Sequence, residues 1–538
     1  MKKSGPQFKH GRRSQTSRIR VTIKGGGNDA TLYARSGDAL IDVLRKAGVP
    51  VLSPCGGKGI CGKCLVRIQN LGMRLACRHV LKRDSEIAFS KHRTSRIVES
   101  EQHVQKTVAL ESGIEKTGKK STVTVSYKGE RLCAYYSASP KAAAQMGIAI
   151  DIGTTTVVAF LQDLASGNTI DAESFINPQA AYGHDVISRI HHTMEHGRGL
   201  AELKKMIVAG INGAIAALCG RAGVSSRDIF KTTVVGNPTM LHLFLGINPS
   251  SLARAPYTPV FTDAQHKSGK ACGLCVNPAG VVLVLPSIAG FVGADVAAGM
   301  AATPLFDSKA YALYIDIGTN GEMAVGNSEK VYCCATAAGP AFEGATLQCG
   351  VGGVEGAICS YDGGRYKTIG GCAPIGICGS GIVDIIAFLL GKKVIDRTGY
   401  MKAEYLIKKK EQSATGRKIV VTPRDVREVQ LAKAAIRAGI TILAQSAEIN
   451  LDSIETVYLA GAFGMFINVE NATAIGMLPR PLKDRIISVG NAAGYGARLA
   501  LSSVDFEESL GKIASKARYI ELSGREDFNE EFVKEMLF

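Results

Sequence analysis

Apolar and polar positions alternate with a period of two near the start of the chain, which is typical of half-buried strands. The expected strands are 18–24, 30–37, 65–69 and 86–90. Residues 38–48 space their apolar side chains as one face of a helix, with Asp38 as the expected N-cap. Residues 18–97 therefore predict a small α+β domain of ordinary size.

A second pattern starts at Gly147, where apolar strands and helices alternate as in α/β folds. Residues 147–153 and 156–163 predict a strand, a polar turn and a second strand, and residues 312–327 repeat the theme. The repeat predicts an α/β domain over 147–538 with two similar lobes, 147–310 and 311–538. Residues 98–146 are expected to be a linker or a reduced middle domain, with strands around 121–127 and 132–138. Residues 1–17 are expected to be a disordered basic tail.

The net charge of +17 is concentrated at one end of the chain. Residues 1–100 contain 21 Lys and Arg against 6 Asp and Glu, so the rest is nearly neutral. Trp is absent and aromatic residues make up 6% of the chain. Few aromatic side chains are therefore available to stack on nucleic-acid bases, and no nucleic-acid partner is expected. The basic segment is interpreted either as a solvated tail or as a surface that steers an acidic protein partner.

No secretory signal is visible, and the longest apolar stretch, 281–300, is interrupted by Pro286 and Asp295. The sequence therefore predicts neither export nor a membrane partner. Fourteen cysteines without an export signal indicate reduced thiols or metal ligation, and a cytoplasmic protein.

Four of the cysteines form one local group within a glycine-rich loop. Cys55, Cys61, Cys64 and Cys77 follow one another at intervals of six, three and thirteen positions. Four thiolates on one compact loop are what a [2Fe–2S] cluster requires, whereas four-cysteine zinc sites favour two Cys-x-x-Cys pairs and this group has one. Cys272 and Cys275 form a separate pair without local partners and are interpreted as structural residues, not as metal ligands. The segment resembles [2Fe–2S] ferredoxins, and this resemblance implies a β-grasp fold.

The two repeated turns, DIGTTT (151–156) and DIGTNGE (316–322), follow apolar strands. Backbone N–H groups and Thr hydroxyls in such turns can hold phosphates, and the Asp carboxylates can hold Mg²⁺ through its waters. The turns resemble the phosphate motifs of the actin, sugar-kinase and heat-shock-chaperone ATPases, which have a ribonuclease-H-like fold. Residues 457–464 resemble the adenosine loop of that superfamily, and 376–384 place glycines at a helix start. The candidate nucleotide residues are Asp151, Gly153, Thr154, Thr155, Asp316, Gly318, Thr319, Asn320, Gly379, Gly381, Gly461 and Gly464.

A ferredoxin domain fused to an actin-like ATPase resembles the reductive activators of corrinoid proteins. The resemblance runs from about Arg18 to the C-terminus and includes 177–190, 337–345, 460–479 and 519–532. One departure is the short segment before the first lobe, since the family often has a fuller middle domain there. A second activator class carries [4Fe–4S] clusters near its C-terminus, and no cysteine follows Cys378 here.

This resemblance implies an ATP-hydrolysing electron-transfer activase. It would pass an electron from its [2Fe–2S] cluster to an inactive Co(II) corrinoid protein and restore Co(I) for methyl transfer, within a methyltransferase system of anaerobic one-carbon metabolism. The implied partners are that corrinoid protein and an upstream low-potential electron donor, and a homodimer is left open. No catalytic residue is identified.

Three other functions stay open. They are an ATP-dependent activator of a non-corrinoid enzyme, a small-molecule kinase with an accessory redox domain, and a ferredoxin carrier with a regulatory nucleotide-binding module. The kinase would need a hydroxyl-binding site and a base, and the sequence identifies neither.

Overall fold

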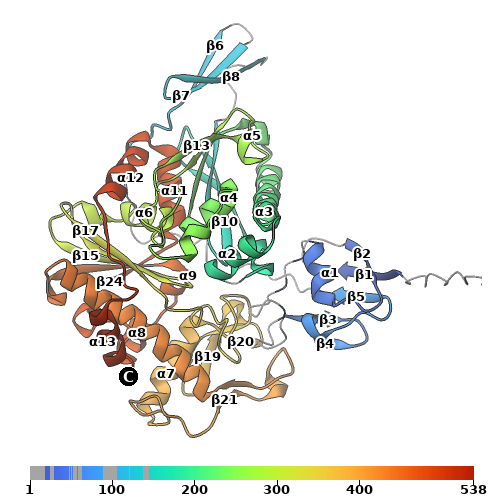
Figure 1. The fold of residues 1–538 in the computed structure, drawn as a ribbon, viewed down its shortest axis with the longest axis vertical. Helices are drawn as coiled ribbons and strands as arrows, with labels where there is room; N and C mark the ends of the chain where they lie inside the picture. Colours follow the sequence, from blue (N-terminus) through green and yellow to red (C-terminus); the bar gives the residue numbers. More distant parts are fainter. Residues whose placement is uncertain are drawn as a thin grey trace, which may run out of the picture. The chain divides into compact units, whose positions relative to one another are not determined.

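The computed structural model describes residues 18–24, 30–47, 49, 51, 57, 64–88, 106–119, 122–136, 145–183 and 185–538. The chain separates into two compact units, residues 1–92 and residues 93–538. Figure 1 shows the ribbon of both units with the elements labelled.

The first unit is built on a five-stranded sheet with the order β2-β1-β5-β3-β4. Its elements are β1 (Arg18–Lys24), β2 (Ala30–Arg35), α1 (Leu40–Lys46), β3 (Leu65–Ile68), β4 (Gly72–Leu75), the 3₁₀ turn η1 (Ala76–Arg78) and β5 (Ser85–Ala88). β1 alternates as expected, with Ile19, Val21 and Ile23 buried against the apolar side of α1. The expected strands and helix are confirmed in place, but β2 ends at Arg35 and β3 at Ile68, because residues 36–37 and 69 already form turns. The segment 89–90 and Gly48 lie outside the described residues.

The predicted N-cap of α1 is wrong. The N-cap residue is Ala39, and no side chain caps the helix. The Asp38 carboxylate instead accepts a hydrogen bond from the Arg35 N–H at 2.8 Å, because the chain enters the helix one residue later than the sequence indicates. Asp38 therefore stabilises the turn between β2 and α1.

In the second unit, the first lobe has a six-stranded sheet with the order β11-β10-β9-β12-β14-β13. Its strands are β9 (Met146–Ile152), β10 (Thr156–Asp163), β11 (Thr169–Ile176), β12 (Ile229–Gly236), β13 (Gln265–Ser268) and β14 (Val281–Val284). Its helices are α2 (Val186–Glu195), α3 (Gly199–Ala222), α4 (Pro238–Leu245), α5 (Gly269–Cys272) and α6 (Ala294–Ala301).

α3 is the one helix of the described residues that is long and apolar enough to cross a membrane by length and composition. It buries Leu203, Ile207 and Ile211 in the core of the first lobe and packs against β10 and β11. Its apolar composition is therefore accounted for by packing on the sheet.

The second lobe repeats the plan, with a six-stranded sheet of order β24-β23-β15-β16-β17-β25. Its strands are β15 (Tyr311–Ile317), β16 (Gly321–Gly326), β17 (Val331–Thr336), β23 (Ile454–Ala460), β24 (Ile486–Gly490) and β25 (Arg518–Tyr519). Two small sheets contain β18 (Ala357–Asp362), β19 (Arg365–Thr368), β20 (Gly376–Ile377), β21 (Tyr405–Lys408) and β22 (Ile419–Val421). Its helices are α7 (Gly379–Gly391), α8 (Pro423–Ser446), α9 (Gly461–Gly464), α10 (Val469–Ala474), α11 (Ala492–Ser502), α12 (Val504–Lys516) and α13 (Glu526–Lys534).

Both predicted strand–turn–strand units are confirmed. β9 pairs antiparallel with β10, and β15 pairs antiparallel with β16. β9 also pairs parallel with β12, and β15 with β23, so each DIGT turn leaves the sheet beside the end of a parallel neighbour. This repeated pairing places the two turns at corresponding positions of the two lobes.

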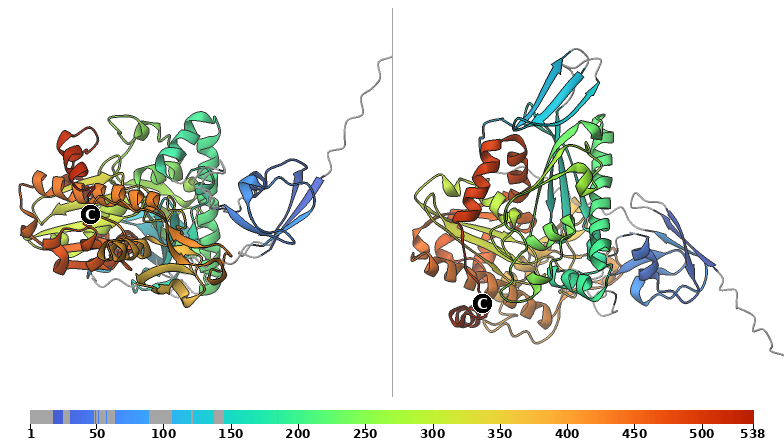
Figure 2. Two further views of the ribbon diagram at one scale, coloured as in Figure 1. Left: turned by 90° about the horizontal axis from the view of Figure 1, so that it is seen from below. Right: turned by 45° about the horizontal axis from the view of Figure 1, so that its top comes forward.

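Helices join the two sheets. α6 packs against both β12 and β16 and also contacts α11. α11 follows the last long strand of the second lobe, yet Ala497, Ala500 and Leu501 are buried in the core of the first lobe. Figures 1 and 2 show α3 on one face of the first-lobe sheet and α11 on the other. The chain therefore crosses back to the first lobe near its C-terminus.

The connector contains a three-stranded sheet, β6 (Ile114–Lys119), β7 (Thr122–Tyr127) and β8 (Glu130–Tyr136), in the order β6-β7-β8. The expected pair β7–β8 is confirmed, and β6 is an additional strand. An ion-pair network anchors this sheet to the first lobe. Lys231 on β12 is fully buried and lies 3.0 Å from Glu507 of α12, whose carboxylate also accepts a hydrogen bond from the Tyr127 hydroxyl at 2.8 Å.

Candidate functional site

The two described cysteines of the predicted cluster loop lie side by side. Cys64 directly precedes β3 and Cys77 follows β4, and these strands pair with Leu65 opposite Leu75. Their sulfur atoms are 3.1 Å apart, and the Cys77 N–H donates to the Cys64 Sγ at 3.4 Å. A disulfide would need about 2.05 Å. Cys55 and Cys61 lie outside the described residues.

This pair fits iron–sulfur ligation. Thiolates are the soft ligands that Fe–S clusters take, and a backbone N–H directed at a ligating sulfur is one of the contacts that tune such clusters. The sulfurs converge from the two ends of one hairpin, so the fold brings together two predicted ligands that are thirteen positions apart in the sequence. Cys272, by contrast, is a buried free thiol at the end of α5.

The first DIGT turn is held by side chains that the sequence analysis did not single out. Asn177 donates from Nδ2 to the Gly153 carbonyl at 2.9 Å, and its own N–H donates to the Thr155 carbonyl at 2.8 Å. Asn237, the N-cap of α4, donates to the Thr154 hydroxyl at 3.0 Å. Backbone and hydroxyl are thus fixed by contacts from two different segments.

Arg189 also donates hydrogen bonds to the first DIGT turn. Its side chain is fully buried and donates to the Thr154 carbonyl from Nη2 and to the Gly183 carbonyl from Nε. Burial lowers the pKa of Arg189 to about 9, which reflects a guanidinium surrounded mainly by neutral acceptors. Its positive charge therefore lies next to a turn that is predicted to bind phosphate.

The second DIGT turn has the same form. The Gly318 N–H donates to the Asn320 carbonyl at 2.9 Å, which closes the turn. Asn320 donates from Nδ2 to Glu322 Oε1 at 3.3 Å, and the Thr319 hydroxyl donates to Glu343 Oε2 at 2.8 Å. The predicted residues of this turn therefore lie together at the end of β15.

Acidic side chains from both lobes gather between the turns. Burial, followed by the charge of Asp295, raises the pKa values of Asp151 and Asp316 to about 7. Burial raises the pKa of Asp295, in the first turn of α6, to about 6. Asn491 offsets part of the effect at Asp151 by donating to Oδ2 at 3.1 Å. The fold thus brings three carboxyl groups together at one place between the lobes.

Among the described residues, no group of three or more His, Cys, Asp or Glu side chains is arranged to bind a metal ion directly. The crowded carboxylates nevertheless have the chemistry that attracts a divalent cation. Mg²⁺ keeps several of its waters and binds one or two carboxylates together with substrate phosphates, so this arrangement fits a water-mediated ion.

Glycines of the predicted adenosine side are required by close packing. Gly461 has φ +85° at the end of β23, and a Cβ there would lie 2.8 Å from Asp316 Oδ1. A Cβ on Gly379 would lie 2.1 Å from the Phe342 carbonyl, and one on Gly381 would lie 2.1 Å from the Ile358 carbonyl. Gly464 packs against Leu459 in the same way. Packing explains these four glycines whether or not nucleotide contacts them.

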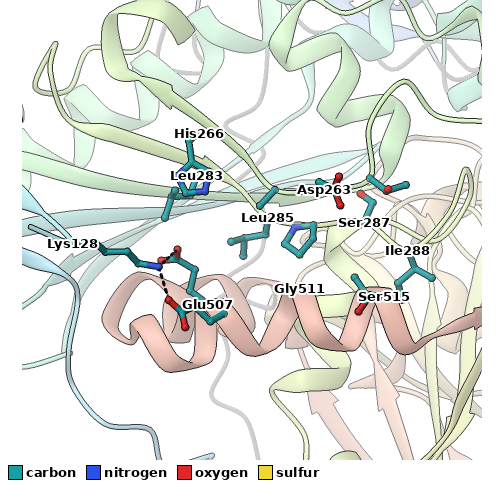
Figure 3. Close-up of a pocket in the computed structure, with 15 residues that line it drawn as sticks. Lys128, Asp263, His266, Leu283, Leu285, Ser287, Ile288, Glu507, Gly511 and Ser515 are labelled. Carbon is teal, nitrogen blue, oxygen red and sulfur yellow. Dashed lines mark hydrogen bonds and ion pairs between the residues drawn. The ribbon is translucent and has the colours of Figure 1, made fainter. Parts of the chain in front are cut away.

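A cavity of about 300 Å³ lies elsewhere in the second unit, between the β13–β14 edge and α12. Figure 3 shows Lys128 reaching toward Glu507 at one end and Ser287 and Ser515 toward the other. None of the residues of the two DIGT turns lines it. The predicted nucleotide residues therefore belong to a different part of the fold.

Three family models match the chain in succession. The 2Fe-2S iron-sulfur cluster binding domain matches residues 23–82, the RACo middle region matches 146–308, and the C-terminal domain of RACo, described as the ASKHA domain, matches 310–538. Corrinoid activation enzyme RamQ of Eubacterium limosum is 34% identical over 568 residues, which cover 92% of this chain and 95% of that protein. The chain belongs to the family of reductive activators of corrinoid proteins.

Two further proteins are similar to the chain over most of its length. A solved structure titled reductive activator for corrinoid, iron-sulfur protein matches with a TM-score of 0.74 and 30% identity, and covers 97% of this chain and 98% of that chain. The Co(II) methylated amine-specific corrinoid protein reductase of Methanosarcina barkeri is 25% identical over 73% of this chain and 77% of that protein. The predicted fold, a ferredoxin domain followed by a two-lobed actin-like domain, is confirmed. In this family the middle region corresponds to the first lobe.

The functional residues that the sequence analysis missed are supporting side chains. Asn177, Arg189 and Asn237 hold the first turn, while Asp295 and Glu343 contribute carboxylates. A signal was present for Asp295, because a carboxylate interrupts an otherwise apolar stretch. Asn177, Arg189 and Glu343 lie in segments that resemble the activator family, whereas Asn237 lies outside them. Nothing in their local pattern indicates the turn that they contact.

Proposed function

We propose that this activator passes an electron from a [2Fe–2S] cluster to the Co(II) form of a corrinoid protein, and that ATP binding and hydrolysis drive the transfer. The observation that carries the proposal is that hydroxyls of the two DIGT turns, one from each lobe, donate to the same Glu343 oxygen, in a chain that also has a ferredoxin-type domain. The names of its relatives, a corrinoid activation enzyme and a Co(II) corrinoid protein reductase, support the substrate. Co(I) would then accept a methyl group.

Cys55, Cys61, Cys64 and Cys77 would hold the cluster, which supplies one-electron transfer when bound. The N–H of Cys77 that donates to the Cys64 sulfur would stabilise negative charge on that ligand and so favour the reduced state. We place the protein in the cytoplasm, where a low-potential electron carrier would reduce it.

The two turns would bind the phosphates of ATP. The hydroxyls of Thr154, Thr155 and Thr319 are the donors, and Asp151 and Asp316 would hold Mg²⁺ through its waters. Nucleotide binding would act by favouring one docked state of activator and corrinoid protein over another. A coupling free energy of ~1–3 kcal/mol is typical of such linkage and shifts a one-electron potential by roughly 40–130 mV.

The test is the anaerobic reduction of a Co(II) corrinoid protein by the reduced activator. The absorbance of Co(I) measures the rate of this reduction. Mg-ATP is expected to accelerate the reduction, because only the nucleotide-bound state favours electron transfer. Cys77→Ser should lose the cluster's EPR signal and the reduction. Cys272→Ser is the matched control and should keep both, because its thiol is a buried core group of the first lobe.

Reduction at full rate without ATP would contradict the proposal and leave a ferredoxin carrier with a regulatory nucleotide module. ATP stimulation of a non-corrinoid enzyme, without any with corrinoid proteins, would assign the chain to a different electron-transfer system. Phosphorylation of a small molecule by Mg-ATP would favour the kinase.

A further inference from the structure

One carboxylate oxygen joins the two DIGT turns. Glu343 Oε2 accepts hydrogen bonds from the Thr319 hydroxyl at 2.8 Å and from the Thr155 hydroxyl at 3.2 Å. Thr155 belongs to the first lobe and Thr319 to the second, so Glu343 connects the lobes at the place predicted for phosphate. Burial raises its pKa, while the two hydroxyls and the charge of Arg189 partly offset that rise.

A bound phosphate would compete for the same donors. Each hydroxyl has one hydrogen to donate, so Thr155 and Thr319 cannot serve Glu343 and a phosphate oxygen at once. Phosphate binding therefore releases the Glu343 carboxylate, which is left beside the phosphate with unused acceptor capacity. A water molecule between them can donate a proton to Glu343 and present its oxygen to phosphorus.

The backbone around Glu343 is held in place. Phe342 stacks on Phe463 of the predicted adenosine loop with ring centroids 4.9 Å apart. Gly344 has φ +73° and lies so close to Val351 that a Cβ would be 2.4 Å from its carbonyl oxygen. Glu343 can thus exchange partners by rotation of its side chain, without a shift of the main chain.

The other acidic side chains near the turns have different partners from those of Glu343. Asp151, Asp295 and Asp316 repel one another and form the region that fits a cation. Glu322 Oε1 accepts a hydrogen bond from Asn320. Among the described carboxylates, Glu343 is the one that accepts hydrogen bonds from hydroxyls of both turns.

We propose that Glu343 is a catalytic residue of ATP hydrolysis: it bridges the turns when no nucleotide is bound and accepts the proton of the attacking water when ATP is bound. In this step the water oxygen bonds to the γ-phosphorus and the bond from that phosphorus to the β,γ-bridging oxygen breaks. ADP leaves with the bridging oxygen, and Glu343 takes the water proton and then releases it to solvent. The inference rests on the proposed function, which supplies ATP as the substrate.

The test compares Glu343→Gln with the wild-type protein for Mg-ATP affinity and for turnover. Gln keeps the shape but removes both the negative charge beside the phosphate and the proton acceptor. The dissociation constant for Mg-ATP is expected to fall roughly threefold to tenfold, because the competing charged acceptor is gone. Turnover is expected to fall ~10²–10⁴-fold, the usual contribution of a general base.

Glu329→Gln is the matched control. Glu329 is exposed and pairs with Lys309 at 3.1 Å on the surface of the second lobe, so its variant should bind and hydrolyse ATP as the wild type does. Glu343→Asp gives a second measurement should the Gln variant unfold. It keeps the charge but withdraws the carboxylate, so turnover should lie between those of the wild type and the Gln variant.

Opposite changes in affinity and turnover distinguish a catalytic role from a structural one. Unchanged turnover in Glu343→Gln and Glu343→Asp would overturn the inference, and so would a loss of turnover matched by an equal loss of ATP affinity. A wild-type protein that binds Mg-ATP without hydrolysing it would overturn the proposed ATP hydrolysis itself. The two failures are therefore separate results.

Discussion

At the scale of single residues, burial and mutual repulsion make the charged forms of the carboxyl groups between the lobes unfavourable. The pKa values of Asp151 and Asp316 are raised to about 7 and that of Asp295 to about 6, so below these values the folded chain without a cation favours their protonated forms. A raised folded pKa in an acid means that stability falls as pH rises from the unfolded value, near 4, through the folded value. Above pH 7 the charges destabilise the nucleotide-free protein.

We therefore expect Asp151→Asn and Asp316→Asn each to raise the melting temperature of the nucleotide-free protein at pH 8 by roughly 2–4 °C, because each variant removes one of the crowded charges. The same variants should lose Mg-dependent ATP turnover while dithionite still reduces the cluster. Calorimetry with and without Mg²⁺, together with phosphate release, measures both effects. A lower melting temperature would show that the charges are already compensated, and undiminished turnover would mean that the turns have another role.

At the scale of elements, α12 links the connector sheet to the first lobe through one buried charge pair. Burial would raise the pKa of Glu507, but Lys231 and the Tyr127 hydroxyl together hold it below its usual value. Lys231 also donates to the carbonyls of Ser112 and Ala500, so its charge is fully partnered. Removal of one member of such a buried pair leaves an uncompensated charge.

Glu507→Gln is expected to destabilise the second unit by ~3–5 kcal/mol, because Lys231 would keep a buried charge without its carboxylate. Glu508→Gln is the matched control on the same helix, and a change below ~1 kcal/mol is expected because its side chain is 56% exposed. Urea unfolding measures both variants. The double variant Lys231→Met with Glu507→Gln should recover part of the loss, and strictly additive losses would show that the two groups do not interact.

At the scale of the whole molecule, charge and chemistry are distributed unevenly along the chain. The segment with the predicted cluster cysteines is strongly basic, whereas the two actin-like lobes are nearly neutral in sum. A basic surface attracts an acidic partner over about one Debye length, ~8 Å at physiological salt. The rate of encounter with a partner should therefore depend on salt even where the final complex does not.

We expect the second-order rate of electron transfer to the corrinoid protein to fall as NaCl rises from low to physiological concentration and beyond. ATP turnover without the partner is the internal control and should change little, because the DIGT turns lie in the lobes. Stopped-flow measurements over a salt series test this. A rate that does not vary with salt would remove the steering role from the basic segment.

The sequence by itself determined the features whose signal is local. The cysteine intervals, the two DIGT turns and their flanking strands depend on residues within about twenty positions, and the structure has the strand pairs where the alternation indicates them. The repeat of one turn at 151 and 316 was sufficient to predict two lobes. The family resemblance followed from the same local motifs and is confirmed.

Only the tertiary structure decided which distant side chains complete these motifs. Glu343 meets Thr155 across 188 positions, and Asn491 meets Asp151 across 340. α11 follows a strand of the second lobe but packs in the core of the first lobe. The periodic apolar face of a helix does not determine which sheet that face will cover. Local sequence specifies a turn or a strand because its hydrogen bonds close within a few residues. The site between the lobes depends on how whole sheets and helices pack, and no short pattern encodes that arrangement.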